Sequence, residues 1–346
     1  MNVTRSQENV SVPSLGPAFC LAEDRTVCET GLRLAILSLS RHCANVPVYV
    51  YRHHPTPAFT QWAERFTQVT LIPERPVGAE SWNCKPHALL PIIARGHSAA
   101  IWLDSDIILT RDCSSLLFPL EPEIFVITQE PASLPSQGTE SRTLGWNLEV
   151  GRRLPITLNS SVLRVTQKHV SLLEQWRALL NDSTYIRVQQ LALEERPLHM
   201  MSDQDVLNGL LGCRDFSSVP LKILRSGDDI IHCGGALGYS LHERARGVFR
   251  RVPTFLHATA GKPWLWLGGQ PEWSQRTFFS WHRRLLQETS PYLAEAKKYE
   301  SQLEEDASWL RTRTGIGVAL TLLGLGNVAL RGLPLTIAAT AIRSIR

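Results

Sequence analysis

The chain has 346 residues, of which 43% are apolar and 20% are charged. This length and composition fit one large or two ordinary folded domains, and they exclude a mini-protein, a collagen-like chain, a coiled coil and a wholly disordered chain. The net charge of +4 comes from residues 307–346, which contain five arginines and no acid, so residues 1–306 carry −1. We expect no nucleic-acid partner, because such proteins carry their positive charge on the folded body.

The cysteines and the N-terminus indicate the compartment. Seven cysteines are scattered without a CxxC pair, and residues 1–20 contain one cation and no continuous apolar run. A disulfide framework, a zinc site and a secretory signal are therefore not indicated. We expect a cytoplasmic protein with reduced thiols.

Apolar runs alternate with stretches of helical period between residues 18 and 110, which is the pattern of a parallel α/β sheet. The expected strands are AFCLA (18–22), VPVYVY (46–51), VTLI (69–72) and AAIWLDSDIIL (99–109). Helices are expected between them over residues 27–43, 57–66 and 86–95. Three βα units in succession predict a doubly wound half-domain of the nucleotide-binding type.

The pattern is mixed after residue 120. Short strands are expected at EIFVI (123–127), PITLN (155–159) and SVLRVT (161–166), followed by a helix near 167–180. A further helix over 202–212 begins at Ser202 as N-cap, with Asp205 in the capping-box position and Gly212 at its end. Apolar residues on one stripe predict a long surface helix over 292–310.

The C-terminal tail is apolar and basic. Seventeen residues without charge run from Thr314 to Leu330, and eleven more follow Arg331. Each run is shorter than the ~20 apolar residues of a membrane span. The composition fits a membrane-surface or re-entrant anchor, a packing or oligomer helix pair, or a true span. We expect deletion of residues 312–346 to leave the activity of the folded domain intact and to release the protein from lipid vesicles.

Two segments contain residues suited to a metal and a phosphate. Asp104, Ser105 and Asp106 follow an apolar run. Because residues i and i+2 of an extended segment face the same side, both carboxylates can approach one cation where open α/β sheets bind ligands. An ordinary turn produces the same pattern, so a D-x-D alone is weak. Far downstream, TFLHATAGKPW supplies His257 and Lys262. A mixed oxygen and nitrogen donor set suits manganese better than calcium, and Lys262 can oppose a diphosphate.

Four motifs stand in one order along residues 18–265: DSD at 104–106, NSSVL at 159–163, DQDVLN at 203–208 and HATAGKPW at 257–264. In these motifs the chain resembles GT-A fold glycosyltransferases, most closely glycosyltransferase family 8. The resemblance implies an α/β fold with a Rossmann-like mixed sheet flanked by helices, to which the composition adds a helical, apolar C-terminal tail. The expected divisions are a flexible N-terminus (1–17), the GT-A domain (18–285), a long amphipathic helix (286–313) and the tail (314–346).

The resemblance also implies the roles of particular residues. Mn²⁺ or Mg²⁺ would be held by Asp104, Asp106 and His257. The residues that would bind a UDP-sugar donor are Lys85, Asp104, Ser105, Asp106, Asn159, Ser160, Gly261 and Lys262. The catalytic pair would be Asp203, which accepts hydrogen bonds from donor hydroxyls, and Gln204, which lies beside the anomeric carbon. Residues 22–24 would hold the uracil ring.

The implied reaction is transfer of a hexose, with retention of configuration, to a glycan, a lipid-linked acceptor or another hydroxyl. Gln204 is a poor nucleophile, which favours attack on the face of the leaving group; a double displacement would need a carboxylate, for which Asp203 and Asp205 are the nearby candidates. The alternative is a non-catalytic GT-A scaffold or sugar-binding protein that docks through its tail. A third function, that of a sugar-1-phosphate nucleotidyltransferase, is disfavoured, because this chain lacks the glycine-rich phosphate loop expected of such an enzyme after the first strand. The cysteines, the N-terminus and the tail together predict a cytoplasmic protein, peripheral at the inner face of the membrane or assembled as a homo-oligomer through its tail.

Overall fold

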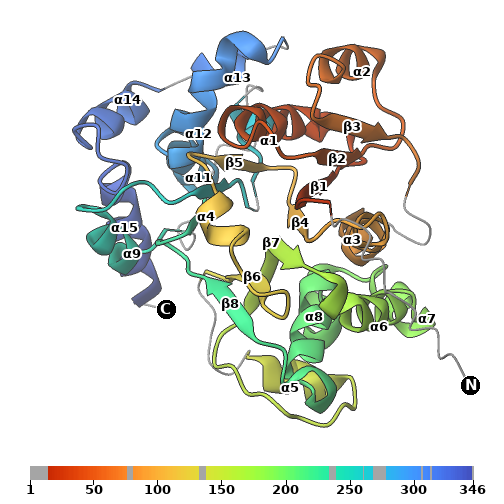
Figure 1. Ribbon diagram of the computed structural model, residues 1–346. Helices are drawn as coiled ribbons and strands as arrows, with labels where there is room; N and C mark the ends of the chain where they lie inside the picture. The colour runs from red at the N-terminus through yellow and green to blue at the C-terminus, as the bar shows by residue number, and fades with distance from the viewer. Residues whose placement is uncertain are drawn as a thin grey trace, which may run out of the picture.

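The computed structural model describes residues 15–75, 81–131, 138–233, 239–259, 261–267, 278–304, 307–311 and 314–344. These ranges contain a seven-stranded sheet and a three-stranded sheet, and Figure 1 shows helices on both sides of the larger one. The predicted mixed α/β sheet flanked by helices is therefore confirmed. Residues 1–14 of the N-terminal segment lie outside the described residues.

The large sheet has the order β3-β2-β1-β4-β7-β6-β8. Its strands are β1 (Ala18–Ala22), β2 (Val48–Tyr51), β3 (Val69–Ile72), β4 (Ala100–Leu103), β6 (Phe125–Gln129), β7 (Leu158–Val165) and β8 (Leu221–Leu224). The first four strands are parallel, whereas β7 runs antiparallel to β4 and to β6. The expected strands over 155–159 and 161–166 are one continuous strand, β7.

Alternate residues of each strand face opposite layers of helices. In β1, Phe19 and Leu21 join one buried cluster, while Ala18 and Cys20 join the other. The first cluster includes side chains of α1 (Glu29–His42), α2 (Pro57–Ala63), α12 (Pro291–Ala296) and α13 (Ser308–Arg311). The second includes side chains of α3 (Lys85–Ala94), α6 (Val170–Leu180) and α8 (Asp203–Gly212). The remaining α-helices include α4 (Ser114–Leu117), α5 (Thr139–Gly145), α7 (Ser183–Val188) and α10 (Pro263–Leu267).

The expected fourth strand over 99–109 is divided between the two sheets. β4 ends at Leu103, and β5 (Ile107–Leu109) pairs instead with β10 (Phe255–His257), which lies beside β9 (Ile230–His232). The N–H of Ile107 donates to the carbonyl of Asp104 at 3.1 Å, which closes a turn over Ser105 and Asp106. The expectation that both acids lie on one side of an extended strand is therefore wrong, because they occupy the turn between two sheets.

The predicted long surface helix over 292–310 is also wrong. α12 ends at Ala296, a 3₁₀ helix covers Lys297–Gln302, and Glu304 has a φ of 54°, which no α-helix accommodates. Tyr292, Tyr299 and Leu310 are each at most 1% exposed. The segment bends because its aromatic and aliphatic side chains pack into the first cluster instead of lining one face of a straight helix.

The C-terminal residues form two helices that pack on the rest of the chain. α14 (Gly315–Leu322) and α15 (Leu333–Ser344) contact α11 (Phe278–Glu288), and α15 also contacts α9 (Leu241–Gly247). Figure 1 shows α15 in dark blue beside α9 in teal. Arg244, 6% exposed, donates to the carbonyl oxygens of Ala329 at 2.9 Å and Arg331 at 2.5 Å. Among the described residues, no helix combines the length and the hydropathy needed to cross a bilayer.

Candidate active site

The turn after β4 and the small sheet bring three metal-ligating side chains together. Ile107 of β5 pairs with His257 of β10, and the N–H of Ala258 donates to the carbonyl of Asp106 at 3.0 Å. His257 Nε2 therefore lies 3.6 Å from Oδ2 of Asp104 and 3.3 Å from Oδ1 of Asp106. One ligand atom from each of the three lies within 4.8 Å of the others. These are the three residues that the sequence motifs pointed to as a metal set.

His232 determines which nitrogen of His257 faces the acids. Its Nε2 lies 3.2 Å from the carbonyl oxygen of Gln129, and its Nδ1 lies 3.2 Å from Nδ1 of His257. A carbonyl oxygen only accepts, so Nε2 of His232 carries the hydrogen. Burial, with the His257 imidazole as a further cause, lowers the pKa of His232 to about 3. The ring is neutral at pH 7, and its Nδ1 can accept from Nδ1–H of His257.

Held in this way, His257 presents Nε2 to Asp104 and Asp106. A lone pair and two carboxylates that face one another repel unless a proton or a cation lies between them. Two carboxylate oxygens and one imidazole nitrogen form a donor set that suits Mn²⁺ or Mg²⁺. The residues present therefore fit the implied metal.

Lys85, the first residue of α3, links the metal turn to α8. Its Nζ lies 3.3 Å from Oδ1 of Asp104 and 3.1 Å from Oδ2 of Asp203, and it donates to Oγ of Ser160 at 2.6 Å. Burial opposes its charge, but Asp104 and Asp203 outweigh burial and raise the pKa of Lys85. Burial raises the pKa of Asp203, and the ammonium of Lys85 opposes that rise. Lys85 therefore stays charged, and Ser160, 1% exposed, lies beneath the pocket and donates to Asp203 at 3.1 Å.

Lys262 approaches the same acids from the other side. Its Nζ contacts Oδ2 of Asp106 and donates to the carbonyl of Ala258 at 3.1 Å. Burial favours the neutral form of Asp106, but Lys262 and His257 outweigh it and lower the pKa of that carboxyl. Gly261 does not line the pocket, and its carbonyl accepts from Nε2 of Gln287 at 3.1 Å. Thus Lys262, but not Gly261, reaches the place where a diphosphate is expected.

The residues after β1 form the end of the pocket where the nucleobase is expected. Ser105 Oγ donates to Oε2 of Glu23 at 2.7 Å, and Nε of Arg25 donates to Oε1 of Glu23 at 2.8 Å. Nη2 of Arg75 lies 3.3 Å from Oδ2 of Asp24. Ser105 is thereby tied to the β1 end of the pocket through Glu23.

Glu130 is a site residue that sequence reasoning missed. It follows β6, and its Oε2 accepts from Nδ2 of Asn159 at 2.5 Å and from Nε2 of Gln204 at 3.4 Å. Nδ2 of Asn159 also donates to Oε1 of Gln204 at 3.0 Å. Burial raises the pKa of Glu130, while the hydrogen bonds from Asn159 and Gln204 oppose the rise. The available signal in the sequence was an acid directly after a short strand, FVITQ, in the same way that Asp104 follows β4.

The start of α8 differs from the expected capping box. Ser202 is the N-cap residue, but its hydroxyl donates to Oδ2 of Asp205 at 2.6 Å and accepts no helix N–H. Oδ1 of Asp205 accepts from Nε of Arg142 at 2.7 Å, and both side chains are buried. The capping box is therefore wrong, because Arg142 draws Asp205 into an ion pair. Asp203 projects from the same turn, and its carbonyl accepts from Nε1 of Trp176 at 3.0 Å.

These side chains line one pocket of about 750 Å³, a volume within the range of small-molecule sites. The predicted site residues that line it are Lys85, Asp104, Ser105, Asp106, Asn159, Asp203, Gln204, His257 and Lys262. Ser160 and Gly261 do not line it, and Glu130 and Arg142 are additions.

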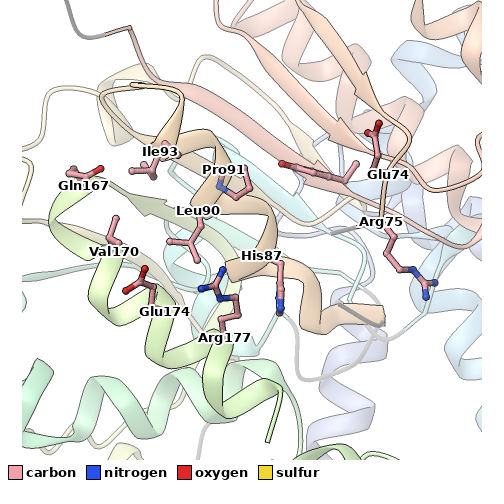
Figure 2. A pocket seen from close by; sticks show the side chains of 12 residues that line it. Glu74, Arg75, His87, Leu90, Pro91, Ile93, Gln167, Val170, Glu174 and Arg177 are labelled. Carbon is pink, nitrogen blue, oxygen red and sulfur yellow. The ribbon is translucent and has the colours of Figure 1, made fainter. Parts of the chain in front are cut away.

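A second groove, of about 580 Å³, runs between α3 and α6. Figure 2 shows His87, Leu90 and Pro91 on α3 and Val170 and Glu174 on α6 around it. It shares Tyr51, Glu74 and Arg75 with the first pocket but includes no predicted site residue. It is therefore a neighbouring surface feature, separate from the metal turn.

No protein-family model matches the chain, and no curated protein matches it. Solved structures with a related arrangement are glycosyltransferases. The bifunctional glycosyltransferase WbbM is 15% identical with a TM-score of 0.48, over 74% of this chain and 48% of its own. A glycosyltransferase involved in glycosylation of the major capsid of PBCV-1 is 11% identical with a TM-score of 0.41, over 72% and 94%. GlyE of Streptococcus pneumoniae is 19% identical with a TM-score of 0.43, over 83% and 64%. The chain spans about half the length of WbbM and under two thirds of GlyE.

Proposed function

We propose that the chain is a metal-dependent glycosyltransferase of the family 8 type, which moves a hexose from a UDP-sugar to a hydroxyl acceptor with retention of configuration. The observation that carries this proposal is the convergence of two carboxylates, one imidazole and two lysines in one pocket. These side chains, Asp104, Asp106, His257, Lys85 and Lys262, come from three separate segments of the chain. Their combination suits a cation together with a diphosphate.

In this proposal Asp104, Asp106 and His257 hold Mn²⁺ or Mg²⁺, which when bound stabilises negative charge on the departing diphosphate. Lys262 contacts Asp106 in the described structure. Binding of the metal and the diphosphate therefore requires the ammonium of Lys262 to leave the carboxylate of Asp106 and to pair with a phosphate. Lys85 keeps its charge between Asp104 and Asp203 and adds a second fixed cation. Both lysines therefore favour departure of the leaving group through their charge, without donating a proton themselves.

In the reaction the bond between the anomeric carbon and the phosphate oxygen breaks, and a bond from the acceptor oxygen forms on the same face. The acceptor proton passes to the departing phosphate oxygen. Gln204, held by Asn159 at 3.0 Å, gives the sugar site a neutral amide instead of a nucleophile. Asp203 and Asp205 are paired with Lys85 and Arg142, which supports this single displacement.

The direct test is a panel of nucleotide sugars with Mn²⁺, scored by released UDP. We expect turnover with a UDP-hexose and a loss of about 100-fold or more in Asp106→Asn, because removal of a group that stabilises transition-state charge costs roughly this much. Glu149→Gln is the matched control, since Glu149 is exposed and pairs only at the surface with Arg214. A folded protein that releases no UDP from any donor would contradict the proposal.

One observation favours the alternative of a non-catalytic sugar-binding module. The contact between Lys262 and Asp106 already neutralises one acid of the metal set. In such a module Mn²⁺ would not alter UDP affinity, and Asp106→Asn would leave ligand binding unchanged. Isothermal titration of UDP with and without Mn²⁺ separates the two functions, because the transferase requires the metal for tight binding.

We further propose that the C-terminal helices contact a membrane surface, where a lipid-linked acceptor would lie. Three leucines at the end of α14 and in the turn that follows it are exposed: Leu322 by 69%, Leu323 by 66% and Leu325 by 87%. The surrounding tail is basic and contains no acid, which suits an anionic lipid surface. We expect the triple Leu→Gln variant at these positions to lose sedimentation with anionic vesicles and Leu144→Gln, exposed on α5, to keep it. A loss of self-association instead would assign the turn to a second copy.

A further inference from the structure

A second cluster of metal-ligating side chains lies where α1 ends and α4 begins. Cys43 follows α1, and Asp112 and Cys113 precede α4. The two sulfur atoms are 3.7 Å apart, and Sγ of Cys43 lies 3.5 Å from Oδ1 of Asp112. One ligand atom from each of the three lies within 4.8 Å of the others. Seventy positions of sequence separate the two cysteines, so the chain shows none of the short spacings by which zinc sites are found.

The distances within this cluster match a tetrahedral thiolate site. Ligands at about 2.3 Å from Zn²⁺, separated by the tetrahedral angle, place two sulfur atoms about 3.8 Å apart. A carboxylate oxygen at about 2.1 Å from the same ion lies about 3.6 Å from each sulfur. The observed 3.7 Å and 3.5 Å therefore need almost no rearrangement around such an ion. A disulfide would need the sulfur atoms to approach to about 2.05 Å.

We propose that Cys43, Asp112 and Cys113 bind one Zn²⁺ ion, with water in the fourth position. Two thiolates and one carboxylate select a thiophilic divalent cation over Mg²⁺ or Ca²⁺. Cys43 and Cys113 are 5% and 0% exposed, whereas Asp112 is exposed and gives the ion a route from solvent. Both thiols release their protons to solvent on binding, and no electron is transferred.

Asp112 is held in position for this role. Its Oδ1 accepts from the backbone N–H of Ser114 at 2.8 Å and from the hydroxyl of Ser114 at 2.6 Å. β5, which follows Asp106 directly, packs on α1 and leads into this cluster. A bound ion would therefore join the end of α1 to the segment that follows the candidate active-site turn. The site does not depend on the proposed transferase activity.

Co²⁺ is the probe, because it replaces Zn²⁺ and produces a near-ultraviolet charge-transfer band only when thiolate is a ligand. The whole chain is stripped of metal, kept reduced with a phosphine and titrated with Co²⁺. We expect the band to saturate at about one ion per chain and to disappear when Zn²⁺ is added. Asp104→Asn should keep it, because the candidate active site contains no sulfur ligand.

Cys43→Ser should abolish the band, and Cys213→Ser, a buried cysteine outside the cluster, should retain it. Asp112→Asn keeps an oxygen for Ser114 and lies at the surface, so it should fold; we expect it to keep the band at saturation and to weaken Co²⁺ binding about tenfold or more. The proposal is overturned if the folded, reduced chain gives no band, if the band survives in Cys43→Ser, or if Asp112→Asn binds Co²⁺ as tightly as the natural sequence.

Discussion

Two side chains, the buried His232 and the half-buried Glu130, support the candidate site although neither belongs to a sequence motif. His232 meets His257 only because β9 and β10 pair in register, and Glu130 meets Gln204 only because β6 lies beside β7 near α8. Such neighbours come from strand pairing across long separations, which periodicity along the chain does not encode. Asp104, Asp106 and Lys262 could be predicted because their motifs are local.

We expect His232→Leu to weaken Mn²⁺ binding by about 10- to 100-fold, as is typical when the partner that orients a metal-ligating histidine is lost. His232→Gln should stay within a few-fold of the natural protein, because an amide can donate to Gln129 and accept from His257. Isothermal titration with Mn²⁺ measures both variants. Equal affinity in the Leu variant, with unchanged thermal unfolding, would show that His257 is oriented by something else.

Glu130 predicts a dependence of stability on pH. Its pKa in the folded protein is raised above the unfolded value of about 4.3, so the folded state binds the extra proton between the two values. Stability is therefore lost as pH rises through this window. Glu130→Gln should raise the Tm by roughly 1–3 °C at pH 8, and the difference should vanish near pH 4. Scanning calorimetry at both pH values checks it, and a gain that is constant with pH would contradict the shifted carboxyl.

At the level of elements, the sequence predicted the first three βα units well. Strands over 18–22 and 69–72 and helices over 29–42 and 85–94 form where apolar period and length indicated them. The failures have a common cause. The run over 99–109 reads as one strand because its apolar residues are continuous, and only the Asp104 turn, stabilised by pairing with β10, divides it. Residues 292–310 read as one helix because the period does not reveal the reversal at Glu304.

Gly31 lies where α1 closely approaches the turn over Ser105 and Asp106. A Cβ at this position would lie 2.6 Å from Cη2 of Trp264 and 3.2 Å from the carbonyl oxygen of Ser105. Gly31→Ala must displace α10 or the turn, and we expect a loss of about 1–3 kcal/mol in the free energy of unfolding. UDP release should fall as well, since Lys262 directly precedes α10.

Gly315→Ala is the matched control for this helix contact, because no atom lies within 4 Å of its added Cβ. It should leave the stability unchanged or raise it by about 0.5–1 kcal/mol. Urea unfolding measures both variants. A Gly31→Ala protein as stable as the natural one would mean that Trp264 moves aside without cost.

At the scale of the whole molecule, the C-terminal helices are bound more closely to the rest of the fold than the composition of the tail indicated. Oε2 of Glu288, itself 1% exposed, accepts from the N–H of Thr314 at 3.0 Å and from its hydroxyl at 2.8 Å. Nδ2 of Asn327 donates to the carbonyl of Val248 at 2.8 Å. A search of the sequence for apolar runs predicts a separable tail. Such a search takes no account of the hydrogen bonds that buried charged side chains require.

Truncation after Arg311 should therefore lower the Tm by roughly 5 °C or more, since Arg244 and Glu288 lose buried hydrogen-bond partners. This differs from the expectation that deletion of residues 312–346 changes only the binding to lipid vesicles and leaves donor hydrolysis intact. Differential scanning fluorimetry of the truncated and full chains provides the comparison. Coincident unfolding curves would restore the interpretation of 314–346 as an appendage.

The division of residues 99–109 between two sheets has a mechanical consequence. Asp104 belongs to the rim of the seven-stranded layer, whereas Asp106 and His257 move with the three-stranded one. An ion bound by all three residues would link the two sheets, so metal binding would reduce the movement of one sheet relative to the other. Amide hydrogen exchange in β7 and β10 would then slow together, although neither strand touches the other in the sheet order.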